Sequence, residues 1–162
     1  MALLACAVML AIAHAFETFG HMAPCLLCLR QRDVYWWGLA ISAVGVAASF
    51  TPAAPIARRL VNLVLIAVFL LGAGTAVYHA GAEWKWWPGP AACSGGSTHV
   101  NAAELSALLR GAKRFAPSCE TPAWVFLGLS MAGWNALISL GLAGVSAAAA
   151  LGGRRPGRAR HG

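Results

Sequence analysis

The chain has 162 residues, of which 59% are hydrophobic and only 10% are charged. A soluble domain carries about 25% charged residues, so these charges cannot cover a water-facing surface, and we expect lipid as the solvent. The length suits one compact domain. Net charge is +7. Part of it lies in a terminal arginine cluster without interleaved aromatic residues, which indicates an anchor beside anionic lipid rather than a nucleic-acid-binding tail. The cluster comprises Arg154, Arg155, Arg158 and Arg160.

Four apolar segments approach the length of about 20 residues that a membrane span needs. They cover about residues 2–19, 34–50, 60–78 and 123–151. Because lipid offers no hydrogen bonds, each must be a helix that satisfies its own backbone. We therefore predict an all-α integral membrane protein: a four-helix transmembrane bundle in one domain, 1–151, followed by a basic cytoplasmic tail, 152–162.

Two loops are expected on the side opposite the termini, at about 20–33 and 80–122. A loop as long as the second is usually functional or disordered, and its stretch 101–115 has the pattern of a short amphipathic helix. Aromatic residues gather toward the same end of the spans, as an interfacial belt does. They are Tyr35, Trp36, Trp37, Tyr78, Trp84, Trp86, Trp87 and Trp124.

Orientation follows from the density of basic residues. Lys and Arg number six on each side, but six fall within about twenty positions on the terminal side and six within nearly sixty on the other. This predicts cytoplasmic termini. The segment Ala13-His14-Ala15 resembles a signal-peptidase site, but no Lys or Arg precedes Arg30. A signal peptide has a basic start, so we expect an uncleaved first span.

A tight cysteine pair, Cys25 and Cys28, precedes the second span and is followed by Arg30 and Arg32. The reactive form of a cysteine is the thiolate, which nearby positive charge or a helix N-terminus favours. Arg32 is four positions after Cys28, so on a helix the two share a face. A permanent cation there can stabilise a thiolate or hold an oxygen of an electron acceptor.

A wide pair, Cys93 and Cys119, lies in the long loop on the same side. Either pair, taken alone, could be a structural disulfide. The presence of both pairs on one side of the membrane predicts instead that a disulfide is exchanged between them. Zinc is the alternative, but it needs four ligands, and no second CxxC or HxxxH occurs among the other candidates, so we expect no metal. Besides the tight pair, the candidate zinc ligands are Cys93, Cys119, His21, His79 and His99.

Cys6, within the first span, is expected to pack as a small hydrophobe.

The residues around the tight pair, Pro24-Cys25-Leu26-Leu27-Cys28-Leu29-Arg30-Gln31-Arg32, resemble the disulfide bond formation protein B (DsbB) family. The likeness extends from about His14 to Leu151. A CxxC alone would be weak, but its combination with two loop cysteines and four spans is specific. The further matching positions are Tyr78-His79, 87–90, Cys93, Cys119 and 126–131.

The resemblance implies a bacterial inner-membrane protein with periplasmic cysteine loops. A DsbA-type thioredoxin-fold partner would form a mixed disulfide with Cys93, Cys119 would exchange with Cys25, and Cys28 would lie next to ubiquinone or menaquinone. Arg32 matches the family's quinone-side arginine. His79 matches a histidine near that site once a one-residue shift is allowed.

Redox potentials agree with a quinone acceptor. A DsbA-type dithiol lies at about −120 mV, so glutathione at roughly −200 mV cannot accept its electrons. A vitamin-K-epoxide-reductase-like protein is one alternative, although its loop pair precedes the CxxC. A membrane scaffold with structural disulfides is the other.

Overall fold

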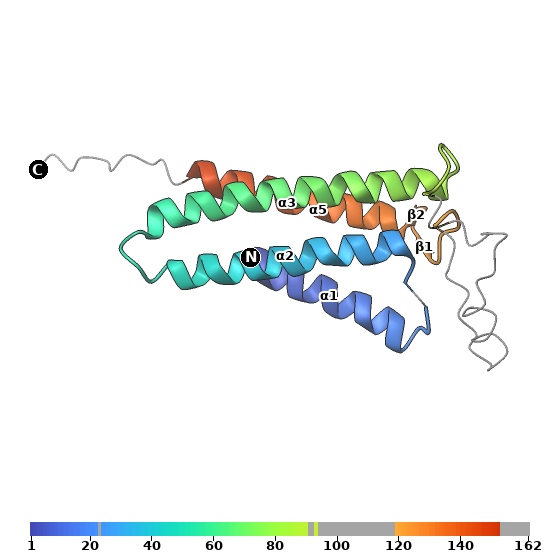
Figure 1. Ribbon diagram of the computed structural model, residues 1–162, viewed down its shortest axis with the longest axis horizontal. Helices are drawn as coiled ribbons and strands as arrows, with labels where there is room; N and C mark the ends of the chain where they lie inside the picture. The colour runs from blue at the N-terminus through green and yellow to red at the C-terminus, as the bar shows by residue number, and fades with distance from the viewer. Residues whose placement is uncertain (23, 91–92, 94–118, 153–162) are drawn as a thin grey trace, which may run out of the picture.

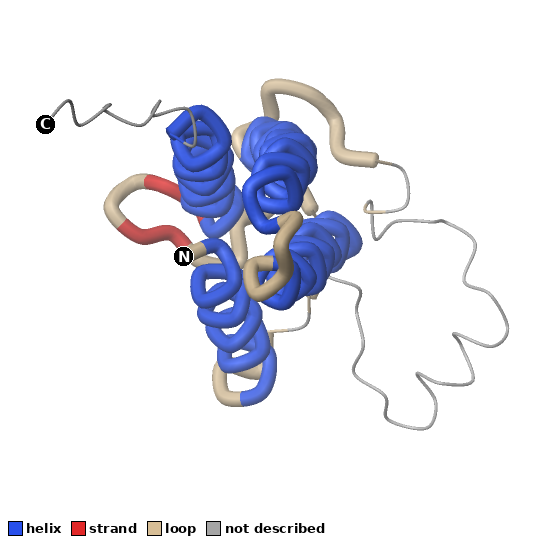
Figure 2. Tube along the Cα trace, turned by 90° about the vertical axis from the view of Figure 1, so that its left-hand side faces the viewer, coloured by secondary structure: helices blue, strands red, loops and turns tan. Residues whose placement is uncertain are grey.

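The structure is a computed structural model that describes residues 1–22, 24–90, 93 and 119–152. Four helices in this part of the chain form an elongated bundle, and Figure 2 shows them grouped around its long axis. The helix α3 packs against both α2 and α5, and α1 packs against α2 (Figure 1). The predicted four-helix architecture is therefore confirmed. The helices are α1 (Ala2–Thr18), α2 (Leu26–Ala48), α3 (Ala54–Glu83) and α5 (Met131–Gly152).

The helix α2 begins at Leu26, well before the expected span start at residue 34. Cys25 is its N-cap: the backbone there is extended, and Sγ accepts a hydrogen bond from the backbone N–H of Cys28 at 3.2 Å. A side chain that accepts from the first turn satisfies a donor that the helix itself leaves unpaired. Consequently Cys28 and Arg32 lie on the first two turns of α2 rather than in a loop.

The helix α3 is longer than the expected span 60–78 at both ends. It starts beside Pro55, which suits a first helical turn. Its end is closed by Lys85, at φ +60°: the N–H of Lys85 donates to Ala82 O and that of Trp86 to Gly81 O. This pair of bonds is the Schellman arrangement. His79 and Glu83 are thereby fixed on the last two turns of α3.

The expected fourth span starts too early. Residues from 123 onward form a small hairpin before α5, with β1 (Val125–Phe126) antiparallel to β2 (Leu129–Ser130). Leu127 and Gly128 both have positive φ, as a type I′ two-residue hairpin turn requires. The Ser130 hydroxyl then accepts from Gly133 N at 3.2 Å and caps α5. Apolar composition alone did not distinguish this hairpin from helix.

The bundle core lies where α1, α2 and α3 approach each other. Cys6, Tyr35 and Phe69 belong to one buried cluster, and Cys6 and Phe69 are fully buried. Gly38 permits this approach, because a Cβ there would lie 2.8 Å from Cys6 Sγ and 3.2 Å from the Phe69 ring. Cys6 is thus a packing residue, as the sequence predicts.

The outer surface of the bundle is apolar. Large hydrophobic side chains such as Leu71, Leu140 and Val145 are exposed, and many exposed apolar side chains are typical of a surface that contacts lipid. By length and composition α3 and α5 could each cross a membrane, and α1 is a shorter apolar helix. The predicted amphipathic helix at 101–115 and most of the basic tail lie outside the described residues.

Candidate functional site: two cysteine pairs beside an apolar cavity

Both cysteine pairs lie at one end of the bundle and pack together. Cys93 and Cys119 form a disulfide, with their Cα atoms 5.3 Å apart. They share one buried cluster with Cys25, and Cys28 packs against it. Cys25, Cys93 and Cys119 are each at most 6% exposed. The four cysteines predicted from the sequence are therefore brought to one place, although 26 positions separate the loop pair.

Cys25 and Cys28 are free thiols with their Sγ atoms 2.8 Å apart. The hydrogen bond with the Cys28 side chain and the contact with His79 hold the pKa of Cys25 well below the usual value of a thiol, against the opposing effect of burial. The backbone N–H of Cys28 adds to this, since Cys25 stands at the N-terminus of α2. The arrangement favours a Cys25 thiolate, the form that attacks disulfides.

A lowered pKa predicts a particular pH dependence of alkylation. The thiolate fraction of Cys25 should stay high as the pH falls below the ordinary thiol value and should decline only near the lowered pKa. We expect its iodoacetamide reaction rate, followed by peptide mass spectrometry, to change little between roughly pH 6 and 8. The same cysteine in unfolded protein should slow about tenfold per pH unit. Parallel profiles in the folded and unfolded protein would contradict the assignment.

His79 faces Cys25 from α3. Its Nε2 lies 3.7 Å from Cys25 Sγ, and its Nδ1 lies 2.9 Å from the Gln31 amide nitrogen. An amide nitrogen can only donate, so Nδ1 is the acceptor and the neutral imidazole carries its proton on Nε2. The N–H of His79 therefore points toward the sulfur that bears the negative charge. The sequence placed His79 near the site only through the family resemblance.

A buried hydrogen-bond chain holds Gln31 in this orientation. The Gln31 side-chain oxygen accepts from Asn135 Nδ2, and Asn135 Oδ1 accepts from the Tyr35 hydroxyl. The hydroxyl of Tyr35 also lies 3.3 Å from Ser139 Oγ. The chain thus crosses from α5 through α2 to α3. Tyr35, which the sequence places in the interfacial belt, is instead 4% exposed in the bundle interior, because its hydroxyl has these partners.

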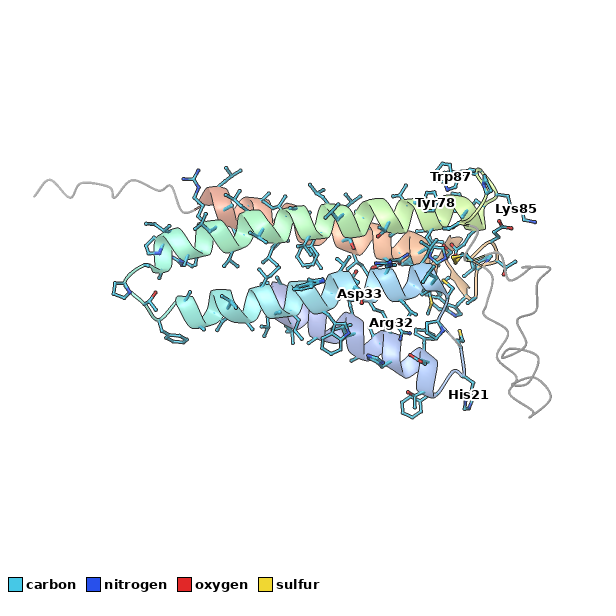
Figure 3. The ribbon with its side chains drawn as sticks, viewed as in Figure 1. His21, Arg32, Asp33, Tyr78, Lys85 and Trp87 are labelled. Atoms are coloured by element: carbon cyan, nitrogen blue, oxygen red, sulfur yellow. A yellow bond between two sulfur atoms is a disulfide. The ribbon has the colours of Figure 1, made fainter. Side chains whose placement is uncertain are left out.

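Arg32 lies between α2 and α1 (Figure 3). It donates to Glu17 Oε2 at 2.5 Å and to the Ala13 carbonyl at 3.1 Å. Both partners belong to α1, so the guanidinium holds the two helices together and is itself held in place. Its side chain is 15% exposed.

An apolar cavity of about 400 Å³ adjoins the tight pair. Its walls come from α1, α2, α3 and α5 and from the segment before the hairpin, and they are mostly apolar. Its volume lies in the usual range for small-molecule sites, and such sites combine apolar walls with a few polar groups. The polar lining includes Cys25, Cys28, Arg32, His79 and Glu83.

Sequence reasoning missed Glu83. It lies one helical turn after His79, with Oε1 3.7 Å from His79 Nε2, and its side chain is only 4% exposed. The only signal in the sequence was an acidic residue four positions after a histidine. Gln31 was likewise not singled out, since glutamine on a helix is ordinary.

Three metal-ligand atoms do converge here: those of Cys25, Cys28 and His79 lie within 4.8 Å of one another. Cys93 and Cys119 are joined to each other, so their sulfurs are not thiolate ligands in this state. The described geometry is consequently that of a dithiol packed beside a disulfide.

Comparisons with known proteins agree with this geometry. Residues 1–149 match the family described as "Disulfide bond formation protein DsbB". A protein named "Disulfide bond formation protein B" from Dechloromonas aromatica (strain RCB) is 34% identical over 146 residues, covering 86% of this chain and 82% of its own length. One of the same name from Methylococcus capsulatus (Bath) is 32% identical over 149 residues, covering 87% and 85%. No solved structure gave a significant match.

Helices with an apolar exterior and two packed cysteine pairs define a membrane protein of thiol–disulfide chemistry. The chain belongs to the DsbB family of disulfide bond formation proteins. It is accordingly an all-α integral membrane protein built on a four-helix bundle. The order of its cysteine pairs, CxxC first, is the one expected of this family rather than of the vitamin-K-epoxide-reductase-like alternative.

Proposed function

We propose that this protein reoxidises a periplasmic DsbA-type dithiol and passes the electrons through its two cysteine pairs to a membrane quinone, ubiquinone or menaquinone. The observation that carries the proposal is the packing of the Cys93–Cys119 disulfide against Cys25 and Cys28 beside an apolar cavity. Family membership adds the role in disulfide formation. The site residues are Cys25, Cys28, Cys93 and Cys119, with Arg32 and His79 at the quinone.

The exchange steps balance in sulfur bonds and protons. A partner thiolate attacks Cys93 and releases the Cys119 thiolate, which attacks Cys25 of an oxidised Cys25–Cys28 pair. The Cys25–Cys119 bond forms and Cys28 is released. When the partner leaves as a disulfide, the freed Cys93 attacks Cys119, which restores the loop disulfide and leaves Cys25 and Cys28 as a dithiol. This last arrangement is the one that the described residues have.

The cavity residues fit a quinone. The walls of the cavity are mostly apolar. The Arg32 side chain, which also lines the cavity, is fixed by two hydrogen bonds to α1. A bound quinone supplies a two-electron acceptor whose oxygens take up two protons. Arg32 would stabilise negative charge on an oxygen of a bound quinone, and the Nε2 proton of His79 is directed at Cys25.

We propose cytoplasmic termini and a periplasmic cysteine end, with the protein in the bacterial inner membrane. Figure 1 shows that α2 begins and α3 ends at the same end of the bundle. The four cysteines cluster at this end. The paired Arg58 and Arg59 lie near the start of α3, at the opposite end. Basic residues concentrate on the cytoplasmic side of membrane proteins, so this separation supports the orientation.

Quinone absorbance tests the proposal directly. Purified protein mixed with a reduced DsbA-type partner and a short-chain ubiquinone should convert the quinone to quinol. In Cys28→Ser the tight pair cannot close, so quinol formation should stop. The Cys25 thiolate can still attack Cys119 of the loop disulfide and release Cys93, so a Cys25–Cys119 disulfide should accumulate, visible by thiol trapping and peptide mapping. Quinol formation at the wild-type rate in Cys28→Ser would refute the relay.

A further inference from the structure

A buried carboxyl group that the exchange steps leave unused lines the same cavity. The Glu83 side chain is 4% exposed, and within the described residues its Oε2 has no hydrogen-bond partner. The cost of burying an ionised carboxylate without partners is high, so such a group is normally paired, protonated or functional. Its position on the cavity wall, beside the dithiol, gives it access to a bound molecule.

Two neighbours fix the position of this carboxyl group. The Oε1 atom lies 3.7 Å from His79 Nε2, the same nitrogen that lies 3.7 Å from Cys25 Sγ. The Ser130 side chain, at the end of β2, is the other polar group close to the carboxyl group. Ser130 also caps α5 through Gly133. Glu83 therefore lies between His79 and the hairpin, and its Oε2 atom remains available to another hydrogen-bond partner.

The proton balance of the dithiol oxidation assigns a role to the Oε2 atom of Glu83. Oxidation of the Cys25–Cys28 dithiol to a disulfide releases two electrons and two protons, and reduction of a quinone to a quinol consumes both. When Cys25 is a thiolate, the pair itself holds only one of the two protons. A second proton must then come from a group that reaches the same cavity.

We propose that Glu83 is the proton donor to the electron acceptor in this cavity: it stores the proton that Cys25 gives up and returns it as the Cys25–Cys28 disulfide forms. The inference rests on the proposed quinone chemistry. In the balanced step the Cys25 thiolate, the Cys28 thiol, protonated Glu83 and quinone yield the disulfide, the Glu83 carboxylate and quinol. The partner dithiol loses two protons in the next cycle, of which one protonates Cys28 and the other returns to Glu83.

The substitution Glu83→Gln tests the proposal because glutamine keeps the shape and removes the titrating oxygen. A single turnover starting from the reduced Cys25–Cys28 pair and a short-chain ubiquinone should slow by about 100-fold, which is in the range for loss of a general acid. Glu83→Ala should slow similarly and be partly restored by added acetate, which can enter the vacated space. Asp33→Asn, an exposed carboxylate on α2, is the matched control and should react at the wild-type rate.

A spectroscopic readout makes the test independent of turnover. Infrared difference spectra between the chemically reduced and oxidised Cys25–Cys28 pair, recorded without quinone, should contain a carboxylic-acid C=O band in the wild type. The band should vanish in Glu83→Gln and persist in Asp33→Asn. Absence of the band from the wild type, or an unchanged turnover rate in Glu83→Gln, would overturn the assignment. If wild-type protein reduced no quinone yet showed the band, the proposed function would fail while Glu83 remained the proton store of the dithiol.

Discussion

A Cys25→Ser protein is expected to keep its Cys93–Cys119 disulfide and yet to form no quinol with a reduced partner. A serine hydroxyl cannot form a disulfide, so the cysteine released in the loop pair has no sulfur to attack. The partner should then be oxidised at most once per protein, and the loop pair should remain reduced or bound to the partner. Thiol trapping with mass shifts, read alongside quinone absorbance, checks both outcomes.

The disulfide that accumulates when electron transfer stops distinguishes the loss of Cys25 from the loss of Cys28. Loss of Cys25 should leave no bond between the two pairs, whereas loss of Cys28 should leave a Cys25–Cys119 bond. Cys6→Ala is the control: Cys6 is a buried thiol in a separate core cluster, and its loss should leave quinol formation intact. Repeated turnover in Cys25→Ser would mean that electrons bypass the tight pair, contrary to the proposal.

An Asn135→Leu protein is expected to lose both stability and the special reactivity of Cys25. Leucine resembles asparagine in shape but leaves the Gln31 oxygen without its partner and removes the acceptor of the Tyr35 hydroxyl. Each buried polar group left unpaired costs about 1–3 kcal/mol. We expect the free energy of unfolding in mixed micelles to fall by roughly that amount or more.

The reactivity of Cys25 should change together with the free energy of unfolding, because Gln31 orients His79. Once the chain is broken, the imidazole is free to turn, and the alkylation rate of Cys25 should regain a steeper dependence on pH. Ser42→Ala is the matched control: Ser42 Oγ is buried and has no partner in the described part of the chain, so its removal should be neutral or stabilising. Equal unfolding free energies for Asn135→Leu and Ser42→Ala would show that the chain contributes nothing.

Local patterns were sufficient for the helices and for the choice of chemistry. The first apolar segment predicts the end of α1 to within one residue, because no residue in that segment interrupts a helix. They place the start of α2 too late, because Arg30, Arg32 and Asp33 look like loop residues while the Cys25 cap already begins the helix. The hairpin before α5 has the same apolar composition as a span and was therefore not separable from one.

The amino-acid sequence by itself determined the four helices of the described residues, the two cysteine pairs and, through their order, the family. These depend on composition and on spacing along the chain. Only the tertiary structure decided which polar groups face the sulfurs, because Gln31 meets His79 across 48 positions and Asn135 meets Gln31 across 104. Glu83 and Tyr35 acquire their roles only when α2, α3 and α5 pack, since burial and hydrogen-bond partners arise from contacts that no local pattern encodes.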